Sequence, residues 1–560
     1  MIRHRLSPIC WGKLLRLYLF FFYFSGITHF LLQITGSTIF VGFRQAVYMS
    51  LLWLIPVLLM PRYTKLIAAL IGSVLWATSM VSLGYFCIYG QEFSQSVMFI
   101  MFESNPAESS EFIAQYFEWW MLAVFAGHSF IAWWLWHRIE PPALTMRQAA
   151  IGSLLILTFL FFFPMFKEGV IKQHPWSDVA DKIQRRMEPA EPWQMVIGYL
   201  QYRKQLASMQ ELLEQNSKLP PLANLEVRDA NLPATLVLVI GESTNRQHMS
   251  LYGYIRPTTP RLDALRDQLT VFEKAVAPRP FTIESLEQIL TFADQENPDL
   301  ALKKPSLMNM MRQAGYKTYW ITNQQTISKR NTMLTNFSKQ MDVQYYMNHS
   351  RAQNSREYDE NVFAPFKEVL EDDAPRKFIV IHLLGTHMKY DYRYPPEFDR
   401  FRDRDGIAPS IPDNRVSVIN AYDNAVLYND FVISTLLETL MTRNDRSLMV
   451  YFADHGEDVY DTPPHDFVGR NEAKPTLAMY AVPFLMWMSP SWKESTGHDF
   501  SNLTQRPYSM AHFIHTWSDL VGITHDEFVP EKSIINPAFV PHPLWIGNPN
   551  NKASLRELQQ

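Results

Sequence analysis

The sequence predicts a chain of two parts, an N-terminal five-helix transmembrane domain followed by an α/β domain that lies outside the cytoplasm. Two observations lead to this fold class. Five long apolar stretches occupy the first 167 of the 560 residues, and short apolar runs alternate with helical patterns from residue 233 onward. A chain of this length is expected to form more than one domain, and the contrast between its two ends indicates where they divide.

The membrane domain is expected over residues 1–167. Its apolar stretches cover residues 14–35, 44–61, 66–89, 118–137 and 149–166. Each stretch is long enough, or nearly so, to cross a hydrocarbon core of about 30 Å as a helix. A cleaved signal peptide would instead contain one shorter apolar segment and a small-residue cleavage site. We therefore expect this end of the chain to span a membrane.

Basic residues in the short loops indicate the orientation, because Lys and Arg are retained on the cytoplasmic side. They precede the first stretch, and they recur as Arg62 and Lys65 after the second stretch and as Arg138 and Arg147 after the fourth. The loop over residues 90–117 has no Lys or Arg but contains four glutamates. A cytoplasmic N-terminus and five crossings would leave everything after residue 167 outside the cytoplasm.

Residues 168–230 are expected to form interfacial helices and a linker. Trp176 and Trp193 alternate here with basic residues, which suits a membrane interface, although an amphipathic helix packed on a soluble domain fits equally well. The two cysteines, Cys10 and Cys87, both precede this segment, so the exported part needs a core of its own rather than disulfides. A net charge of −4 without a basic run argues against a nucleic-acid partner.

The α/β domain is expected over residues 231–560. Five apolar runs are predicted strands: ATLVLVI, KTYWIT, FIVIHLL, SLMVYFA and VPFLMWM. The helical patterns are LDALRDQL, SLMNMMRQAG and NAVLYNDFVISTLLETLM. Continuous apolar strands separated by helices indicate a parallel sheet that is covered on both faces.

Several predicted strands end in residues that suit a metal ion. Glu242 follows the first strand, and Asp454 and His455 follow the fourth. In an open parallel sheet the carboxyl ends of the strands share one edge, so these side chains are expected to converge there. Two carboxylates and an imidazole suit Zn²⁺ with a position left for a reacting group, and without sulfur they could also hold Mn²⁺. An Asp-His pair alone would more often belong to a capped loop.

The nucleophile is left open by the residues themselves. Candidate hydroxyls in this region are Ser243, Thr244, Thr258, Thr259 and Thr282. Thr282 begins a helical pattern after two prolines, and a helix N-terminus stabilises phosphate through its free N–H groups. A Thr in that position is usually just an N-cap.

Two histidines are further candidates. His387 ends a strand, whereas His465 lies in a loop where a surface histidine is the ordinary interpretation. His382, His512 and His515 lie in apolar patterns and are assigned no role.

The segment LVLVIGESTNRQHMSLYGYIRPTTP, the Thr282 segment, LLGTH and YFADHGE occur in this order behind the apolar stretches. In these motifs the chain resembles the inner-membrane phosphoethanolamine transferases of Gram-negative bacteria, within the alkaline phosphatase and sulfatase superfamily. The likeness is greatest to the branch that modifies the lipopolysaccharide core. It implies an alkaline-phosphatase-like periplasmic domain behind the transmembrane domain, anchored in the inner membrane.

The resemblance also implies roles for individual residues. Glu242, Thr282, Asp454 and His455 would surround a zinc ion, with zinc expected ahead of manganese, and Thr282 would be the nucleophile. His387 and His465 match histidines that contact the phosphoryl group or a second metal, and Lys329 matches a phosphate-binding lysine. The expected reaction is transfer of phosphoethanolamine from phosphatidylethanolamine to the lipopolysaccharide inner core, at a phosphorylated heptose, through a covalent intermediate on threonine.

Two departures and three rivals limit this interpretation. The segment APRPFTIESL lacks the cysteines that the lipid A enzymes carry near the nucleophile, and NQQTISK replaces an Asn-rich segment before the lysine. The alternatives are transfer to lipid A, phosphoglycerol transfer of the lipoteichoic-acid-synthase type, and a non-catalytic binding module. A sulfatase is disfavoured, because no Cys or Ser is followed by x-Pro-x-Arg.

Overall fold

The computed structural model describes residues 11–35, 40–89, 117–201, 203, 219–324, 337–348, 358–443, 445–497, 499–549 and 554–558. The chain divides into two compact units, Met1–Ala207 and Ser208–Gln560, and each is considered by itself.

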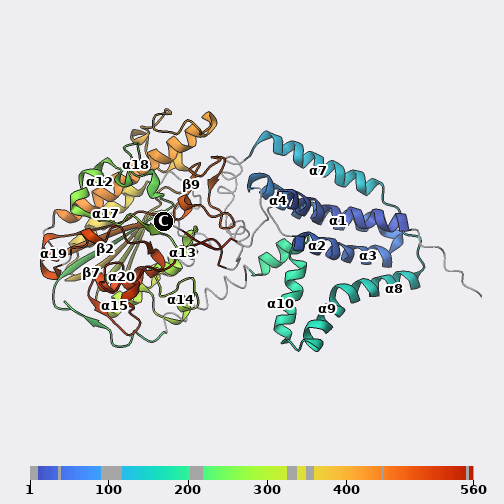
Figure 1. The fold of residues 1–560 in the computed structure, drawn as a ribbon, viewed down its shortest axis with the longest axis horizontal. Helices are drawn as coiled ribbons and strands as arrows, with labels where there is room; N and C mark the ends of the chain where they lie inside the picture. Colours follow the sequence, from blue (N-terminus) through green and yellow to red (C-terminus); the bar gives the residue numbers. More distant parts are fainter. Residues whose placement is uncertain are drawn as a thin grey trace, which may run out of the picture. The chain divides into compact units, whose positions relative to one another are not determined.

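All regular elements among the described residues of the first unit are helices (Figure 1). Its longer helices are α1 (Trp11–Ile34), α2 (Phe40–Met49), α4 (Thr64–Tyr89), α7 (Trp119–His137), α8 (Met146–Leu157) and α10 (Trp176–Met187), with the short α3 (Leu54–Leu59) and α9 (Phe163–Met165) between them. Helix α1 packs against both α2 and α4. Phe20, Phe21 and Phe24 on α1 are buried in the core that these helices share.

Four helices, not five, are long and apolar enough to cross a membrane among the described residues. These candidate spans are Trp11–Ile34, Gly42–Leu59, Pro61–Ile88 and Met146–Ile171. The predicted span over 118–137 is a helix, α7, but it is not one of these four candidates. The reason is its composition, because five tryptophans and two histidines replace aliphatic residues in a helix of 19. Tryptophans at both ends are typical of a helix end at the membrane–water interface.

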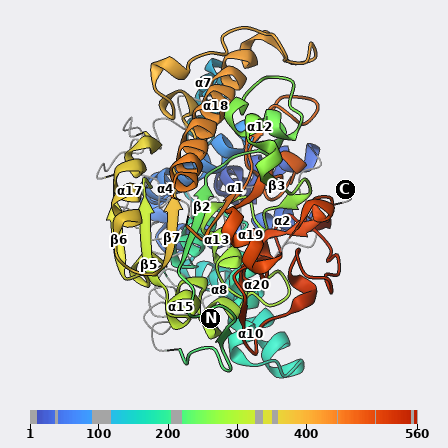
Figure 2. The same cartoon turned by 90° about the vertical axis from the view of Figure 1, so that its left-hand side faces the viewer.

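The second unit is built on a seven-stranded sheet with the order β3-β11-β8-β2-β7-β5-β6. The strands are β2 (Ala234–Gly241), β3 (Leu269–Val271), β5 (Lys317–Thr322), β6 (Val343–Tyr346), β7 (Arg376–His382), β8 (Ser447–Ala453) and β11 (Phe484–Met488). Strand β2 lies in the centre, parallel to β7 on one side and to β8 on the other. Figure 2 shows β6, β5, β7 and β2 following one another across the sheet.

Helices cover both faces of this sheet, as the apolar strands predict. On one face α13 (Thr282–Ile289), α15 (Leu307–Gln313) and α20 (Phe513–Leu520) contribute Leu286, Met310 and Trp517 to the main core. On the other face lie α17 (Phe363–Glu371) and the long α18 (Asp413–Met441), where Asn429 donates to the Tyr451 hydroxyl of β8 at 3.0 Å. All eight residues of β2 are buried.

All five predicted strands exist, but β11 runs antiparallel to β8 rather than parallel to it. The connection from β8 to β11 contains no α-helix of the kind that usually carries the chain back across a sheet between parallel strands. The short edge strands β3 and β6 were not predicted from sequence. Helix α18 begins at Asp413, earlier than its apolar pattern indicates, and α12 (Pro260–Ala264) ends before the predicted pattern does.

Candidate active site

The register of the two central strands brings the two carboxylates together. Gly241 of β2 pairs with Ala453 of β8, so the next residues, Glu242 and Asp454, leave the sheet side by side at its carboxyl edge. Both are buried. Asp454 Oδ1 accepts hydrogen bonds from the backbone N–H groups of Ser243 at 3.1 Å and His455 at 2.7 Å. The backbone thus fixes one oxygen of Asp454 and leaves the other facing the site.

The turn after β7 supports Glu242 from the other side. Thr386 donates to the Glu242 carbonyl oxygen through its backbone N–H at 3.0 Å and its hydroxyl at 3.1 Å. Gly385 makes this approach possible, because its φ is +56° and a Cβ there would lie 2.7 Å from the backbone N and O of Glu242. A residue with a side chain at position 385 would displace the carboxylate.

Thr282 lies at the first position of α13 and directs its hydroxyl at these groups. Its Oγ1 donates to the Glu242 carboxylate, at 3.1 Å from Oε1 and 3.0 Å from Oε2, and lies 3.3 Å from His455 Nε2. The same helix is held to the strand edge by Ser285, whose hydroxyl donates to the Asp454 carbonyl at 2.5 Å. Thr282 is therefore a positioned group of the site rather than a simple cap, and no side-chain cap bond is formed at this helix start.

The His455 ring presents a lone pair to the site. Its Nδ1 lies 2.9 Å from the Gly456 carbonyl oxygen, which can only accept, so Nδ1 carries the proton. Nε2 accepts from Arg470 Nη1 at 2.7 Å. Arg470 also lies 3.9 Å from Glu242 Oε1. Sequence reasoning missed Arg470, because nothing in FVGRNE distinguishes it from a surface arginine before the fold is known.

These residues fit a metal ion. One ligand atom each from Glu242, Asp454 and His455 lies within 4.8 Å of the others. Asp454 Oδ2 is buried and accepts no hydrogen bond within the described part of the chain. Burial raises the pKa of Asp454 well above its usual range, and the adjacent Glu242 carboxylate adds to this effect. A divalent cation would satisfy the free oxygen and relieve the repulsion between the carboxylates.

The remaining predicted residues have different outcomes. His387 forms no hydrogen bond to the cluster among the described residues, and its Nδ1 donates to the Met388 carbonyl at 2.6 Å. Burial lowers its pKa to about 3, although Glu242 acts in the opposite direction. His465 donates to the Tyr460 carbonyl through Nδ1 at 2.7 Å, and in this part of the structure it forms no hydrogen bond to Thr282. Lys329 lies outside the described residues.

An ion network centred on the buried His248 was also missed from sequence. His248 bridges two carboxylates, with Nδ1 at 2.6 Å from Asp423 and Nε2 at 2.8 Å from Asp461. Burial alone would lower the pKa of His248, but Asp461 and Asp423 outweigh it and raise the pKa to about 10. Asp461 belongs to the loop between Asp454 and His465, so this network ties that loop to α18.

Comparison with known proteins gives a consistent result. The sulfatase family profile matches residues 234–523. Phosphoethanolamine transferase EptC of Escherichia coli K12 is 50% identical over 541 residues, covering 96% of this chain and 94% of the relative. Phosphoethanolamine transferase CptA of Salmonella typhimurium is also 50% identical, with the same coverage. The chain belongs to the phosphoethanolamine transferase family. It is accordingly a transferase with a sulfatase-like domain behind membrane helices.

Solved structures agree with both parts of this transferase. The crystal structure of the C-terminal periplasmic domain of E. coli EptC in complex with Zn is 55% identical, covers 60% of this chain and 96% of its own, and has a TM-score of 0.59. The integral membrane phosphoethanolamine transferase EptA of Neisseria meningitidis covers 93% of this chain and 97% of its own with a TM-score of 0.64. At 18% identity the second structure shows the shared fold alone.

Proposed function

We propose that this transferase moves phosphoethanolamine from phosphatidylethanolamine to the inner core of lipopolysaccharide, at a phosphorylated heptose, with Thr282 as the nucleophile. The observation that carries the proposal is the Thr282 hydroxyl held 3.0 Å from Glu242 beside Asp454 and His455. Zinc is the proposed metal, held by Glu242, Thr282, Asp454 and His455. A zinc ion in this position would lower the pKa of the hydroxyl and make it nucleophilic at neutral pH.

The reaction would take place in two displacements. In the first, a bond forms between Thr282 Oγ1 and the phosphorus of the donor lipid, while the bond from phosphorus to the diacylglycerol oxygen breaks. Glu242 would accept the hydroxyl proton at hydrogen-bond distance and pass the same proton on to the departing diacylglycerol oxygen. In the second, a lipopolysaccharide oxygen attacks the same phosphorus and releases Thr282.

Arg470 would stabilise the charge on the phosphoryl oxygens. The His455 Nε2 lone pair cannot accept from Arg470 and bind a cation at once, so a bound cation frees the Nη1 donor. A guanidinium already oriented toward the reacting group suits phosphate oxygens through two parallel N–H groups. His387, His465 and Lys329 are proposed as further contacts to the phosphoryl group.

The choice of the lipopolysaccharide core rests on sequence relationships. The two enterobacterial relatives named above are 50% identical along almost the whole chain. The Kdo(2)-lipid A phosphoethanolamine 7''-transferase of Salmonella typhimurium is 28% identical over 279 residues, which cover 48% of this chain. Both cysteines lie before residue 90, so the region around Thr282 also lacks the cysteines of the lipid A enzymes. These differences favour an acceptor other than lipid A.

We further propose that the catalytic domain, residues 231–560, lies in the periplasm of a Gram-negative cell, joined to an inner-membrane domain (1–167) by the connector 168–230. With the N-terminus in the cytoplasm, this location requires an odd number of crossings. Besides the four candidate spans, α7 is a helix of 19 residues without a single Asp, Glu, Lys or Arg. Alkaline phosphatase and fluorescent-protein fusions after residues 137 and 230 would test this topology.

The function is tested by mass spectrometry of lipopolysaccharide from a null strain that carries either the wild type or Thr282→Ala. Core oligosaccharide and lipid A are analysed separately. One phosphoethanolamine unit on the core, lost with Thr282→Ala, is the expected result. The same unit on lipid A would overturn the acceptor, and a glycerophosphate unit would overturn the donor. No change in either fraction would contradict the transferase reaction at lipopolysaccharide altogether.

A further inference from the structure

A small polar pocket lies inside the first unit, among helices that are otherwise apolar. Ser25, Thr28 and His29 of α1, Ser82 of α4, and Glu191 and Gln194 after α10 line it. The space inside is about 10 Å³, which is close to the volume needed for one water-sized group. A carboxylate buried among membrane helices is costly and marks a functional site by default.

Three hydrogen-bonding atoms in the residues that line this pocket have no partner within the described part of the chain. They are Thr28 Oγ1, His29 Nδ1 and Glu191 Oε2. These side chains are deeply buried, with residue exposures of 7%, 4% and 4% respectively. The other atoms of the acid are engaged, since its Oε1 accepts from Ser82 at 2.6 Å and its backbone N–H donates to Ser25 at 2.9 Å.

The three free atoms can all accept hydrogen bonds. His29 Nε2 lies 2.5 Å from the Pro189 carbonyl oxygen, so Nε2 carries the proton and the neutral ring leaves Nδ1 as an acceptor. Glu191 Oε2 offers a carboxylate lone pair, and a hydroxyl such as that of Thr28 can accept as well as donate. The pocket therefore presents three acceptors, one of which belongs to an acidic group.

A primary ammonium group matches this arrangement. It is close in size to a water molecule, it has three N–H donors, and its charge is opposite to that of Glu191. A water molecule has only two donors and would leave a carboxylate uncompensated. A cation in the pocket would favour the ionised form of the buried Glu191 carboxyl group, because it compensates the negative charge.

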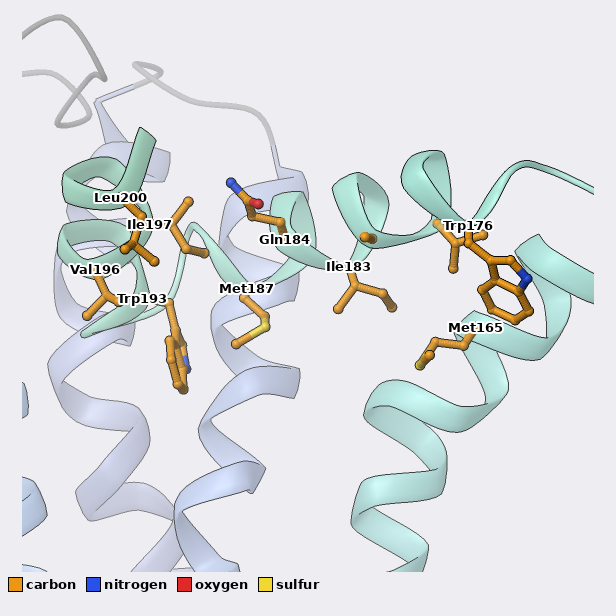
Figure 3. A pocket seen from close by; sticks show the side chains of 11 residues that line it. Met165, Trp176, Ile183, Gln184, Met187, Trp193, Val196, Ile197 and Leu200 are labelled. Atoms are coloured by element: carbon orange, nitrogen blue, oxygen red, sulfur yellow. The ribbon is translucent and has the colours of Figure 1, made fainter. Parts of the chain in front are cut away.

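An apolar cavity of about 440 Å³ lies against the same segment of chain (Figure 3). Met165, Trp176, Ile183, Met187, Trp193 and Ile197 are among its lining residues. Figure 3 shows Met187 and Trp193 directed to the same side, below α10 and the helical residues 193–201. Trp193 follows Glu191 by two residues, so the polar pocket and this cavity share one short stretch of backbone.

We propose that the first unit binds an aminophospholipid, with its primary ammonium in the polar pocket and one acyl chain in the apolar cavity. This proposal rests on the proposed function, in which such a lipid is the phosphoethanolamine donor. The donor would then have a binding site on the membrane unit itself. The three acceptors discriminate against a quaternary ammonium headgroup, which has no N–H group and is too large for the pocket.

The test measures which lipid the full-length protein retains. Purified wild type is exchanged into mixed micelles with equal amounts of phosphatidylethanolamine and phosphatidylcholine of identical acyl chains, and the bound lipid is identified by native mass spectrometry. The wild type is expected to retain roughly ten times more of the ethanolamine lipid than of the choline lipid. This ratio corresponds to the smallest usual contribution of a hydrogen bond to a charged group. Glu191→Gln and Thr28→Val are each expected to reduce this preference, and Thr28→Val removes only a hydroxyl that has no partner.

Two controls separate the possible outcomes. Glu140→Gln alters an exposed carboxylate of the same unit that pairs with Lys13, and it should leave the preference unchanged. Thr282→Ala should abolish transfer yet keep the lipid preference, so a failure of the proposed function is distinct from a failure of this site. Equal retention of both lipids by the wild type, unaltered preference in both pocket variants, or loss of the preference in Thr282→Ala would each overturn the proposal.

Discussion

Replacing Arg470 separates the roles of charge and metal at the active site. Its side chain is 12% exposed, and its Nη1 lies 2.7 Å from His455 Nε2 and 3.9 Å from Glu242 Oε1. If this donor turns to the phosphoryl oxygens during reaction, Arg470→Ala removes one charge-assisted hydrogen bond of about 1.5–3 kcal/mol. At about 1.4 kcal/mol per tenfold, kcat is expected to fall roughly 10- to 150-fold.

The affinity of Arg470→Ala for zinc is expected to increase or to remain unchanged. Arg470 is a cation that occupies the lone pair of His455, so its removal leaves the ligands freer and the site more negative. The assay pairs transfer kinetics on a fluorescent phosphatidylethanolamine with zinc competition against a chelator. Arg470→Lys keeps the positive charge but lacks the paired N–H donors of the guanidinium, so it should give an intermediate rate. Arg443→Ala, at a half-buried arginine that pairs with Glu371 and Asp445, should behave as wild type.

Loss of zinc together with activity in Arg470→Ala would refute this reasoning, because the arginine would then support the metal ligands instead of the substrate. An unchanged rate with zinc still bound would refute it equally, since Arg470 would then have no role in the transfer reaction.

Three further predictions concern the neighbouring groups. Thr282→Ser should retain a covalent intermediate that is detectable by intact mass, whereas Thr282→Ala should form none; labelling of the alanine variant would place the nucleophile elsewhere. Asp454→Asn removes a buried carboxylate oxygen that has no hydrogen-bond partner in the described structure, so zinc affinity in chelator titrations should fall by more than roughly tenfold, and full affinity would exclude Asp454 as a ligand. The pKa of His248 is raised to about 10, so its contribution to stability is complete below about pH 6.5 and is lost as the pH rises through 10. The difference in Tm between wild type and His248→Gln should therefore shrink between pH 7 and 10, and a constant difference would contradict the ion network.

Much of the fold could be predicted because buried strands have a recognisable apolar composition. The β2 and β8 runs are apolar at nearly every position, and such runs are typical of strands covered on both faces. The strand direction of β11 could not be predicted, because an apolar run carries no information on whether the chain returned through a crossover. At α7 the apolar pattern alone does not distinguish a membrane span from an interfacial or packed helix, since tryptophan suits both the lipid interface and a protein core.

The sequence by itself determined the chemistry available at the sheet edge. Glu242, Asp454 and His455 follow directly after apolar strands, and parallel strands end at one edge, so their convergence could be predicted from topology. Thr282 needed the resemblance to a family, because its hydroxyl was one of several in that region.

Only the tertiary structure decided which groups face one another. Arg470 bonds His455 from 15 positions further along the chain, His248 bridges carboxylates from two distant elements, and Glu191 bonds Ser82 of α4 inside the membrane unit. None of these contacts repeats with the period of a helix or a strand. Sequence patterns reveal structure mainly through such periods, so these contacts could not be predicted from the sequence. Hydrogen bonds between side chains depend on where loops bring single atoms, and that placement results from packing of the whole domain.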